Sequence, residues 1–189
     1  MSSVIIAGDT SGTITLAAPA VSGTTTLTLP STTGTVLTTG STGQVINKAS
    51  LPTGSVLQVV NATYATQSST SSASFVDTSL TATITPTSNT SKILVFVSQT
   101  GLYKAATDSY IKLQLVRGAT SIVGFEFELA STAAAGTNAV ATSTTYLDSP
   151  ATTSATTYKT QIARAGAAGT IYWCLTSATA TITLMEIAA

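Results

Sequence analysis

The feature that most constrains this chain is the alternation of apolar and hydroxyl-bearing residues with a period of two. In residues 80–85, for example, Leu80, Ala82 and Ile84 alternate with three threonines. Successive side chains of a β-strand point to opposite faces of a sheet, so this period predicts strands with one apolar and one polar face. No segment keeps the i, i+3, i+4, i+7 spacing of an amphipathic helix over three turns. The chain is therefore predicted to be all-β.

Threonine, serine and alanine make up nearly half of the 189 residues, with 41, 24 and 28 copies. The branched side chain of threonine fits the pleated surface of a strand well. Disorder is typical of chains that combine low hydropathy with high net charge, whereas this chain has a mean hydropathy of +0.40 and no net charge. We therefore expect an ordered structure rather than a flexible linker.

The ionisable residues exclude several classes of function. The chain has no histidine, one cysteine (Cys174), 7 basic and 7 acidic residues. It therefore cannot build a Ser-His-Asp or Cys-His centre, an internal disulfide or a thiolate zinc cluster. The basic residues are scattered, so they do not form the basic surface that binding to nucleic acid requires. Apolar runs of about five residues are too short to span a membrane. We expect a protein that is not an enzyme, binds no cofactor, metal or nucleic acid, and does not insert into a membrane.

The distribution of charge divides the chain into segments. Lys48 is the only charged residue between Asp9 and Asp77, and short alternating runs at 13–16, 26–29 and 35–37 are separated by Gly and Pro. We interpret 1–47 as an extended Thr/Gly-rich attachment arm, 48–54 as a linker, and 55–189 as a head domain. The head has an ordinary size for a single core.

The arm cannot bury itself. GTITLAAP (12–19) and GTTTLTLP (23–30) match at five of eight positions, which indicates either a repeat of one strand and one turn or the chance self-similarity of a Thr-rich sequence. Its few apolar side chains cannot offset a backbone ordering cost of roughly 1–2 kcal/mol per residue. The arm should be ordered only against other protein, either its own copies or a surface that it anchors to. The candidate attachment residues are Ile14, Leu16, Leu27, Leu29 and Val36.

The head is expected to contain nine strands separated by turn signals. Many short strands at near-regular spacing predict an antiparallel β-sandwich of jelly-roll type. The expected strands are at about 55–64, 75–85, 92–98, 109–117, 121–129, 140–148, 156–164, 170–176 and 180–187.

One of these strands is apolar on both faces. The run ILVFV at 93–97 should place one face in the core, whereas Leu94 and Phe96 on the other should meet a second buried surface. That surface is either a subunit interface or a loop of the same chain, and the sequence favours neither.

Three residues are candidates for receptor contact. Tyr103, Lys104 and Asp108 lie in a predicted polar loop, where an aromatic ring and charged groups could stack on a sugar and bind its hydroxyls. The alternative is that Tyr103 packs over a strand edge and the charges only keep the surface soluble. Glu126 and Glu128 are the only carboxylates close in sequence, and such a pair is more typical of a solvated strand face than of a calcium or catalytic site.

Several short segments stand out along the chain: GTITL (12–16), TTTLTLP (24–30), GTVLT (34–38), GSVLQVV (54–60), SKILV (91–95), LVRGAT (115–120) and ITLMEI (182–187). In this order they resemble segments of tail-fibre and other virion appendage proteins of tailed bacteriophages, notably phages of marine bacteria and cyanobacteria. The resemblance implies a virion component, usually a homotrimer, with an N-terminal attachment region and a C-terminal β-rich head. The chain is short and lacks the extended shaft of long receptor-binding fibres.

Two functions follow as expectations. The first is a homotrimeric, non-enzymatic tail-fibre-type appendage that docks to the virion through its arm, with a head that contacts a host-surface glycan or simply protrudes. The second is a capsid decoration protein whose arm lies across capsomers and stabilises the shell. Both place the protein in the virion, which is assembled in the cytoplasm of the bacterial host. In both, the protein contacts other tail or capsid proteins.

Overall fold

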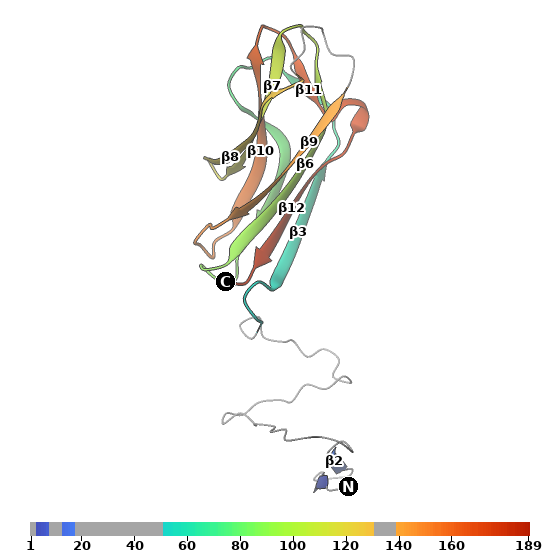
Figure 1. Ribbon diagram of the computed structural model, residues 1–189, viewed down its shortest axis with the longest axis vertical. Coiled ribbons are helices and arrows are strands. Elements are labelled where there is room, and N and C mark those ends of the chain that lie inside the picture. Colours follow the sequence, from blue (N-terminus) through green and yellow to red (C-terminus); the bar gives the residue numbers. More distant parts are fainter. Residues whose placement is uncertain (1–2, 8–12, 18–50, 131–138) are drawn as a thin grey trace. The chain divides into compact units, whose positions relative to one another are not determined.

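The computed structural model describes residues 3–7, 13–17, 51–130 and 139–189 (Figure 1). The chain separates into two units, Met1–Val45 and Ile46–Ala189. In the first unit, β1 (Ser3–Ala7) pairs antiparallel with β2 (Thr13–Ala17), which places Ile6 opposite Ile14 and Val4 opposite Leu16. The sequence predicted the strand at 13–16 but not its partner β1. The other attachment candidates, Leu27, Leu29 and Val36, lie outside the described residues.

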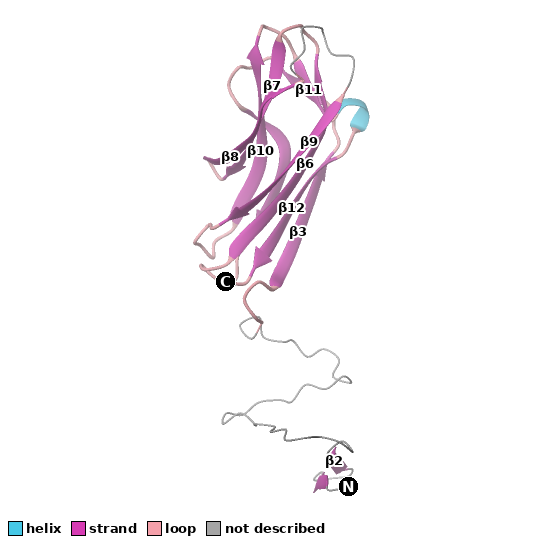
Figure 2. Ribbon diagram, viewed as in Figure 1, coloured by secondary structure: helices cyan, strands magenta, loops and turns pink. Residues whose placement is uncertain are grey.

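The second unit is a sandwich of two antiparallel sheets, as the sequence predicted (Figure 2). The smaller sheet has the order β5-β10-β7-β8, and the larger has the order β3-β12-β6-β11-β4, with β9 also paired to β6. The chain crosses repeatedly between the sheets, which is the jelly-roll arrangement. The strands are β3 (Val56–Tyr64), β4 (Ser68–Thr70), β5 (Val76–Ile84), β6 (Lys92–Lys104), β7 (Ser109–Arg117), β8 (Thr120–Leu129), β9 (Val140–Asp148), β10 (Thr156–Gly166), β11 (Ile171–Trp173) and β12 (Ala180–Ile187).

The core lies between the sheets and follows the alternation of the sequence. Leu80, Ala82 and Ile84 of β5 are buried, while the intervening threonines are exposed. Each strand supplies its apolar face to the same cluster, and burial of an Ile or Leu side chain stabilises the fold by roughly 1.5–3 kcal/mol. The other central members of the cluster are Ile93, Val95, Val97, Ile111, Leu113, Leu115, Tyr158, Ile162, Ile171, Trp173, Ile182 and Leu184.

Strand β8 departs from strict alternation. Strict alternation would put Phe127 on the buried side of this strand, opposite to Glu126 and Glu128, but Phe127 is 60% exposed. The register between β7 and β8 shifts three times, so Leu113 lies opposite Glu126 and Gln114 opposite Gly124. Each bulge moves the following side chain to another face, and a period-two argument cannot detect it.

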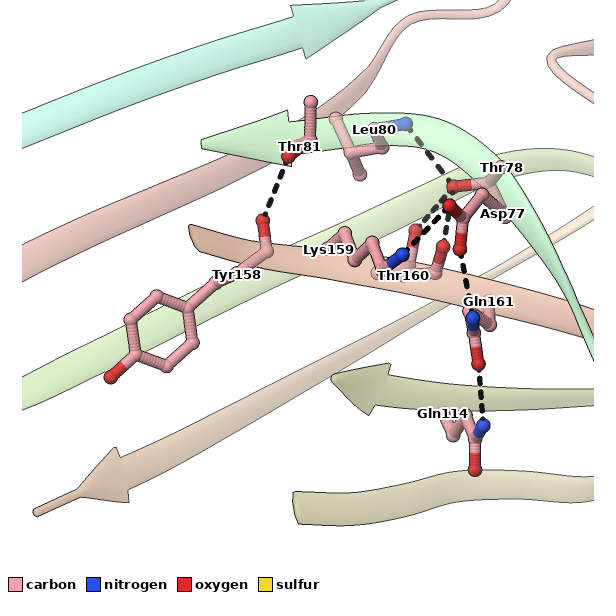
Figure 3. Close-up of polar contacts among 9 residues, drawn as sticks. All are labelled: Asp77, Thr78, Leu80, Thr81, Gln114, Tyr158, Lys159, Thr160 and Gln161. Atoms are coloured by element: carbon pink, nitrogen blue, oxygen red, sulfur yellow. Dashed lines mark hydrogen bonds and ion pairs between the residues drawn. The ribbon is translucent and has the colours of Figure 1, made fainter. Parts of the chain in front are cut away.

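Polar side chains also hydrogen-bond inside the core. The hydroxyls of Thr78 on β5 and Thr160 on β10 hydrogen-bond to each other (Figure 3). Across the core, Thr160 donates to the side-chain oxygen of Gln99 on β6 at 3.2 Å. The indole nitrogen of Trp173 donates to the carbonyl of Thr78 at 2.9 Å. All four residues are buried, so these bonds fix the relative positions of both sheets.

The carboxylate of Glu186 is buried near residues 54–55, where the linker joins the head. The amide of Gly54 donates to the carbonyl of Ala188 at 2.8 Å, which brings residues 54–55 beside the end of β12. There the carboxylate of Glu186, which is 0% exposed, accepts hydrogen bonds from the amide and the hydroxyl of Thr87, both at 2.7 Å, and from the amide group of Gln58. Burial alone would raise the pKa of Glu186, but these hydrogen bonds outweigh it and hold the pKa below its ordinary value.

Gly101 allows β6 to continue beyond its pairing with β12 and β9 to a third partner, β11. The pairing of β6 with β9 is irregular between Gln99 and Leu102, and Gly101 has a φ of 61° in the left-handed region. A Cβ at this position would collide with the backbone nitrogen of Leu175 and lie 2.9 Å from the carbonyl carbon of Cys174. The bulge lets β6 continue to Lys104 and pair with β11, which is why this strand is longer than predicted.

We predict that Gly101→Ala lowers the free energy of unfolding by about 3 kcal/mol or more, because left-handed strain adds to a backbone collision. Gly118→Ala is the matched control, since Gly118 has a φ of 58° with open space around its Cβ position and should cost only about 1–2 kcal/mol. Urea unfolding of both variants measures the difference. Equal losses would show that the contact with residues 174–175 does not constrain the bulge.

We predict that Glu186→Gln lowers stability by about 1–3 kcal/mol at pH 7, because Thr87 and Gln58 would no longer donate to a charged, buried acceptor. The folded pKa of Glu186 is below the unfolded one, so the contribution of the carboxylate is complete above about pH 4.3 and disappears as the pH falls through the folded pKa. Urea unfolding at a series of pH values should show a gap between wild type and variant that is constant near neutrality and narrows below about pH 4. A gap that widens on acidification would contradict the assigned direction of the shift.

Candidate functional site: the outer face of the larger sheet

An apolar row crosses the solvent side of the larger sheet. The register places Val59 of β3 opposite Met185 of β12, Met185 opposite Leu94 of β6, and Leu94 opposite Leu147 of β9. Residues opposite each other in neighbouring strands share a face and lie side by side. We call the outward residues of these four strands the outer face.

The apolar side chains of the outer face are well exposed. Val59 is 55% exposed, Leu147 50% and Phe96 39%, and Val56 at the start of β3 is 50% exposed. These are four of the five large apolar side chains that are exposed in the described part of the chain, and Phe127 is the fifth. Single exposed apolar residues are common, whereas a contiguous exposed apolar patch is typical of interaction sites.

The remaining outward positions are uncharged. The next row consists of Asn61, Thr183, Phe96 and Thr145, and the row after it of Thr63, Thr181, Ser98 and Ser143. Lys92, at the start of β6, is the only charged residue among the outward positions of β3, β12, β6 and β9. Covering this face would therefore remove almost no ion from water, and no like charges would meet if two copies approached each other.

The smaller sheet presents the opposite chemistry (Figure 3). Across its outer side, Asp77 accepts from Lys159 at 2.7 Å and from Gln161 at 2.8 Å, and Gln114 donates to Gln161 at 2.7 Å. The hydrogen bond from Lys159 holds the pKa of Asp77 below its ordinary value. The two faces of the sandwich thus differ: one carries a chain of charged and amide groups, and the other an apolar row flanked by hydroxyls.

The structure places Leu94 and Phe96 on the outer face, while Ile93, Val95 and Val97 are buried in the core. The prediction that one side of 93–97 meets the core is confirmed. Phe96 is 39% exposed, so the alternative in which a loop of the same chain covers this side does not hold for the described residues. The sequence missed Val59, Met185 and Leu147, because only the strand order and register bring them beside Leu94.

The receptor candidates do not form the polar loop that the sequence suggested. Tyr103 and Lys104 belong to β6, and the side chain of Lys104 is among the most deeply buried, with 1% exposure. Only Asp108 lies in the turn after the strand and is exposed. The prediction was wrong because the bulge at Gly101 extends β6. Tyr103 packs against Tyr172 on the neighbouring strand β11, with ring centroids 5.8 Å apart.

Two further reactive groups make structural contacts. Glu126 accepts a hydrogen bond from Thr142 at 2.8 Å. The thiol of Cys174 donates to the carbonyl of Tyr64 at 3.4 Å, and burial raises its pKa. The described residues contain no group of three or more His, Cys, Asp or Glu side chains that could hold a metal ion. Within the same residues, no helix is long and apolar enough to cross a membrane.

The sequence matches no protein-family model, and no curated protein matches it either. The function of this head is therefore inferred from the chemistry of the outer face.

Proposed function

We propose that this chain is a non-enzymatic structural protein of a phage virion, a homotrimeric appendage of tail-fibre type that docks through its arm. The observation that carries the proposal is the outer face, where an apolar row crosses four strands without a charged residue. The virion and the number of copies come from the resemblance of the sequence to tail-fibre proteins.

The outer face supports self-association of the heads. Because Lys92 is its only charged residue, the outer face can meet a copy of itself with little like-charge repulsion. The central residues Leu94, Phe96 and Met185 are large and apolar, as at the centre of a stable protein interface, and the surrounding threonines resemble its polar rim. Leu94 and Phe96 therefore remain the proposed subunit contacts, joined by Val59 and Leu147.

The arm is proposed to bind other virion proteins by adding strands to their sheets. Backbone hydrogen bonds would supply binding, and the apolar residues at alternate positions would anchor the strand. The described part of the arm is compatible with this role because Ile14 and Leu16 lie on a strand, β2, which is already paired with β1.

We predict that the double variant Phe96→Lys and Leu147→Lys dissociates the trimer, because each substitution would bury an unpaired ammonium group at the interface. Sedimentation equilibrium of the wild type should give about three times the chain mass of 19.0 kDa, whereas the variant should give a single chain mass and bind itself at least about 100-fold more weakly. The matched control is Thr83→Lys, an exposed position on the smaller sheet that should leave the trimer intact. A trimeric double variant, or a monomeric wild type, would overturn the proposed contact.

We predict that Leu27→Asp together with Leu29→Asp removes the protein from virions while the head still folds. Charged side chains at both anchors would have to be desolvated on docking. Quantitative detection of the protein in purified particles measures attachment, and circular dichroism checks the head. Retention of the variant on particles would exclude these residues as anchors.

A capsid decoration protein is the second candidate, because an uncharged face between copies and a docking arm would serve a shell as well as a tail. Imaging virions labelled with an antibody against residues 55–189 distinguishes the two. Label on the tail supports the appendage, and label spread over the shell supports decoration.

A further inference from the structure

A cavity of about 280 Å³ opens where β7 turns into β8, away from the outer face. Its walls come from the end of β7, from the connection between β9 and β10, and from the first residues of β10. The amide of Gly118 donates to the carbonyl of Thr157 at 2.8 Å and ties the two strands together beside the cavity. The residues that give the cavity its chemistry are Arg117, Pro150, Thr152, Ala155, Thr156 and Thr157.

The guanidinium of Arg117 is held in place by the buried residue Asp148. Its Nη1 atom donates to both carboxylate oxygens of Asp148, at 2.9 and 2.7 Å. Asp148 also accepts from the hydroxyl of Tyr158 at 2.6 Å, and Asp148 and Tyr158 are buried, with 6% and 0% exposure. Burial raises the pKa of Tyr158, with a further contribution from Asp148, so the phenol keeps the proton that it donates. The orientation of Arg117 is therefore set before any ligand arrives.

Both hydrogen bonds from Arg117 to Asp148 come from one nitrogen of the guanidinium, Nη1. Arginine has five N–H donors in a planar fork, so the edge formed by Nε and Nη2 is not used by Asp148. The side chain is 30% exposed and lines the cavity. A planar edge of two parallel N–H groups matches the two oxygens of a carboxylate.

The remaining walls indicate what such a carboxylate would be attached to. The hydroxyl of Thr152 accepts a hydrogen bond from the amide of Ser154 and keeps its proton to donate, whereas the hydroxyl of Thr156 donates to the carbonyl of Ser154 and can still accept. Pro150 and Ala155 add an apolar wall. These groups suit a ring with hydroxyl groups, and the volume is close to the lower end for small-molecule sites.

We propose that this cavity binds a small hydroxylated monocarboxylate, such as a uronic acid residue, with its carboxylate on the edge of Arg117 that Asp148 does not use. A phosphate dianion fits less well, because Asp148 already offsets the charge of Arg117 and no second cation is among the residues around the cavity. The site goes beyond the assembly role proposed above and does not depend on the number of copies.

Nuclear magnetic resonance of the ¹⁵N-labelled full chain tests this site, because the chain has two arginines and their Nε–H signals report separately. Titration with sodium glucuronate should shift the Arg117 signal and the amides of Gly118 and Thr157 in a saturable way. Arg164, whose Nε donates to the carbonyl of Ser71 at 3.1 Å, serves as the internal reference and should not move. Glucose, and sodium chloride at equal ionic strength, should produce no saturable shift at Arg117.

Two variants locate the binding without disturbing the ion pair. Ala155→Phe fills the cavity from an exposed position and should weaken binding at least about tenfold, whereas Thr153→Phe, exposed but not part of the cavity wall, should bind as the wild type does. No saturable shift with glucuronate, an equal response to glucose, or unchanged binding by Ala155→Phe would each overturn the proposal. Those results would not affect the sedimentation test of the outer face, so a failure of this site is distinguishable from a failure of the proposed subunit contact.

Discussion

The rest of the structure depends on the position of β6, a strand with large apolar side chains on both of its faces. Ile93, Val95 and Val97 on the inner side pack in the core between the sheets. A strand in this position cannot be an edge, and β12 and β9 pair with it on either side. The outer side then carries Leu94 and Phe96 to the middle of a four-strand surface. The central position of β6, which the packing of its inner side chains requires, thus also places apolar side chains in the centre of the outer face.

The two sheets differ in how their outer sides carry polar groups. On the smaller sheet, the bonds among Asp77, Lys159, Gln161 and Gln114 satisfy polar groups that face water. On the larger sheet, threonine and serine occupy most outward positions around the apolar row. Hydroxyls can face water in a free chain and a neighbouring protein in an assembly, at a small cost of desolvation in the second case. The composition therefore suits a domain that meets other protein over one complete face.

Much of the fold could be predicted from the sequence, because alternation identifies strands and the buried side of most of them. β5 follows the pattern residue by residue, and β7 follows it from Ser109 to Leu115. The failures all involve local backbone geometry. The bulge at Gly101 moves Tyr103 and Lys104 from an expected loop into a strand, and the shifts in β8 expose Phe127. The short strand β4 lies in a run of serine and threonine residues that reads as a turn.

The candidate site was only half visible in the sequence. Leu94 and Phe96 could be identified because they lie in one apolar run, whereas Val59, Met185 and Leu147 come from three other strands. Register between strands far apart in sequence is a tertiary property, and no local pattern specifies it. The Arg117 cavity depends in the same way on the packing of β7 against the connection between β9 and β10.

The central claim is that another copy of the chain covers the outer face in solution. Hydroxyl-radical footprinting of the full chain tests it most directly, because Phe96 and Phe127 have the same intrinsic reactivity. In a free head their exposures of 39% and 60% would give Phe96 about two-thirds of the oxidation rate of Phe127. The account predicts that the oxidation rate of Phe96 is several-fold lower than two-thirds of the Phe127 rate. It also predicts that Met185 is protected from oxidation. Oxidation of Phe96 at about two-thirds of the Phe127 rate would contradict the account.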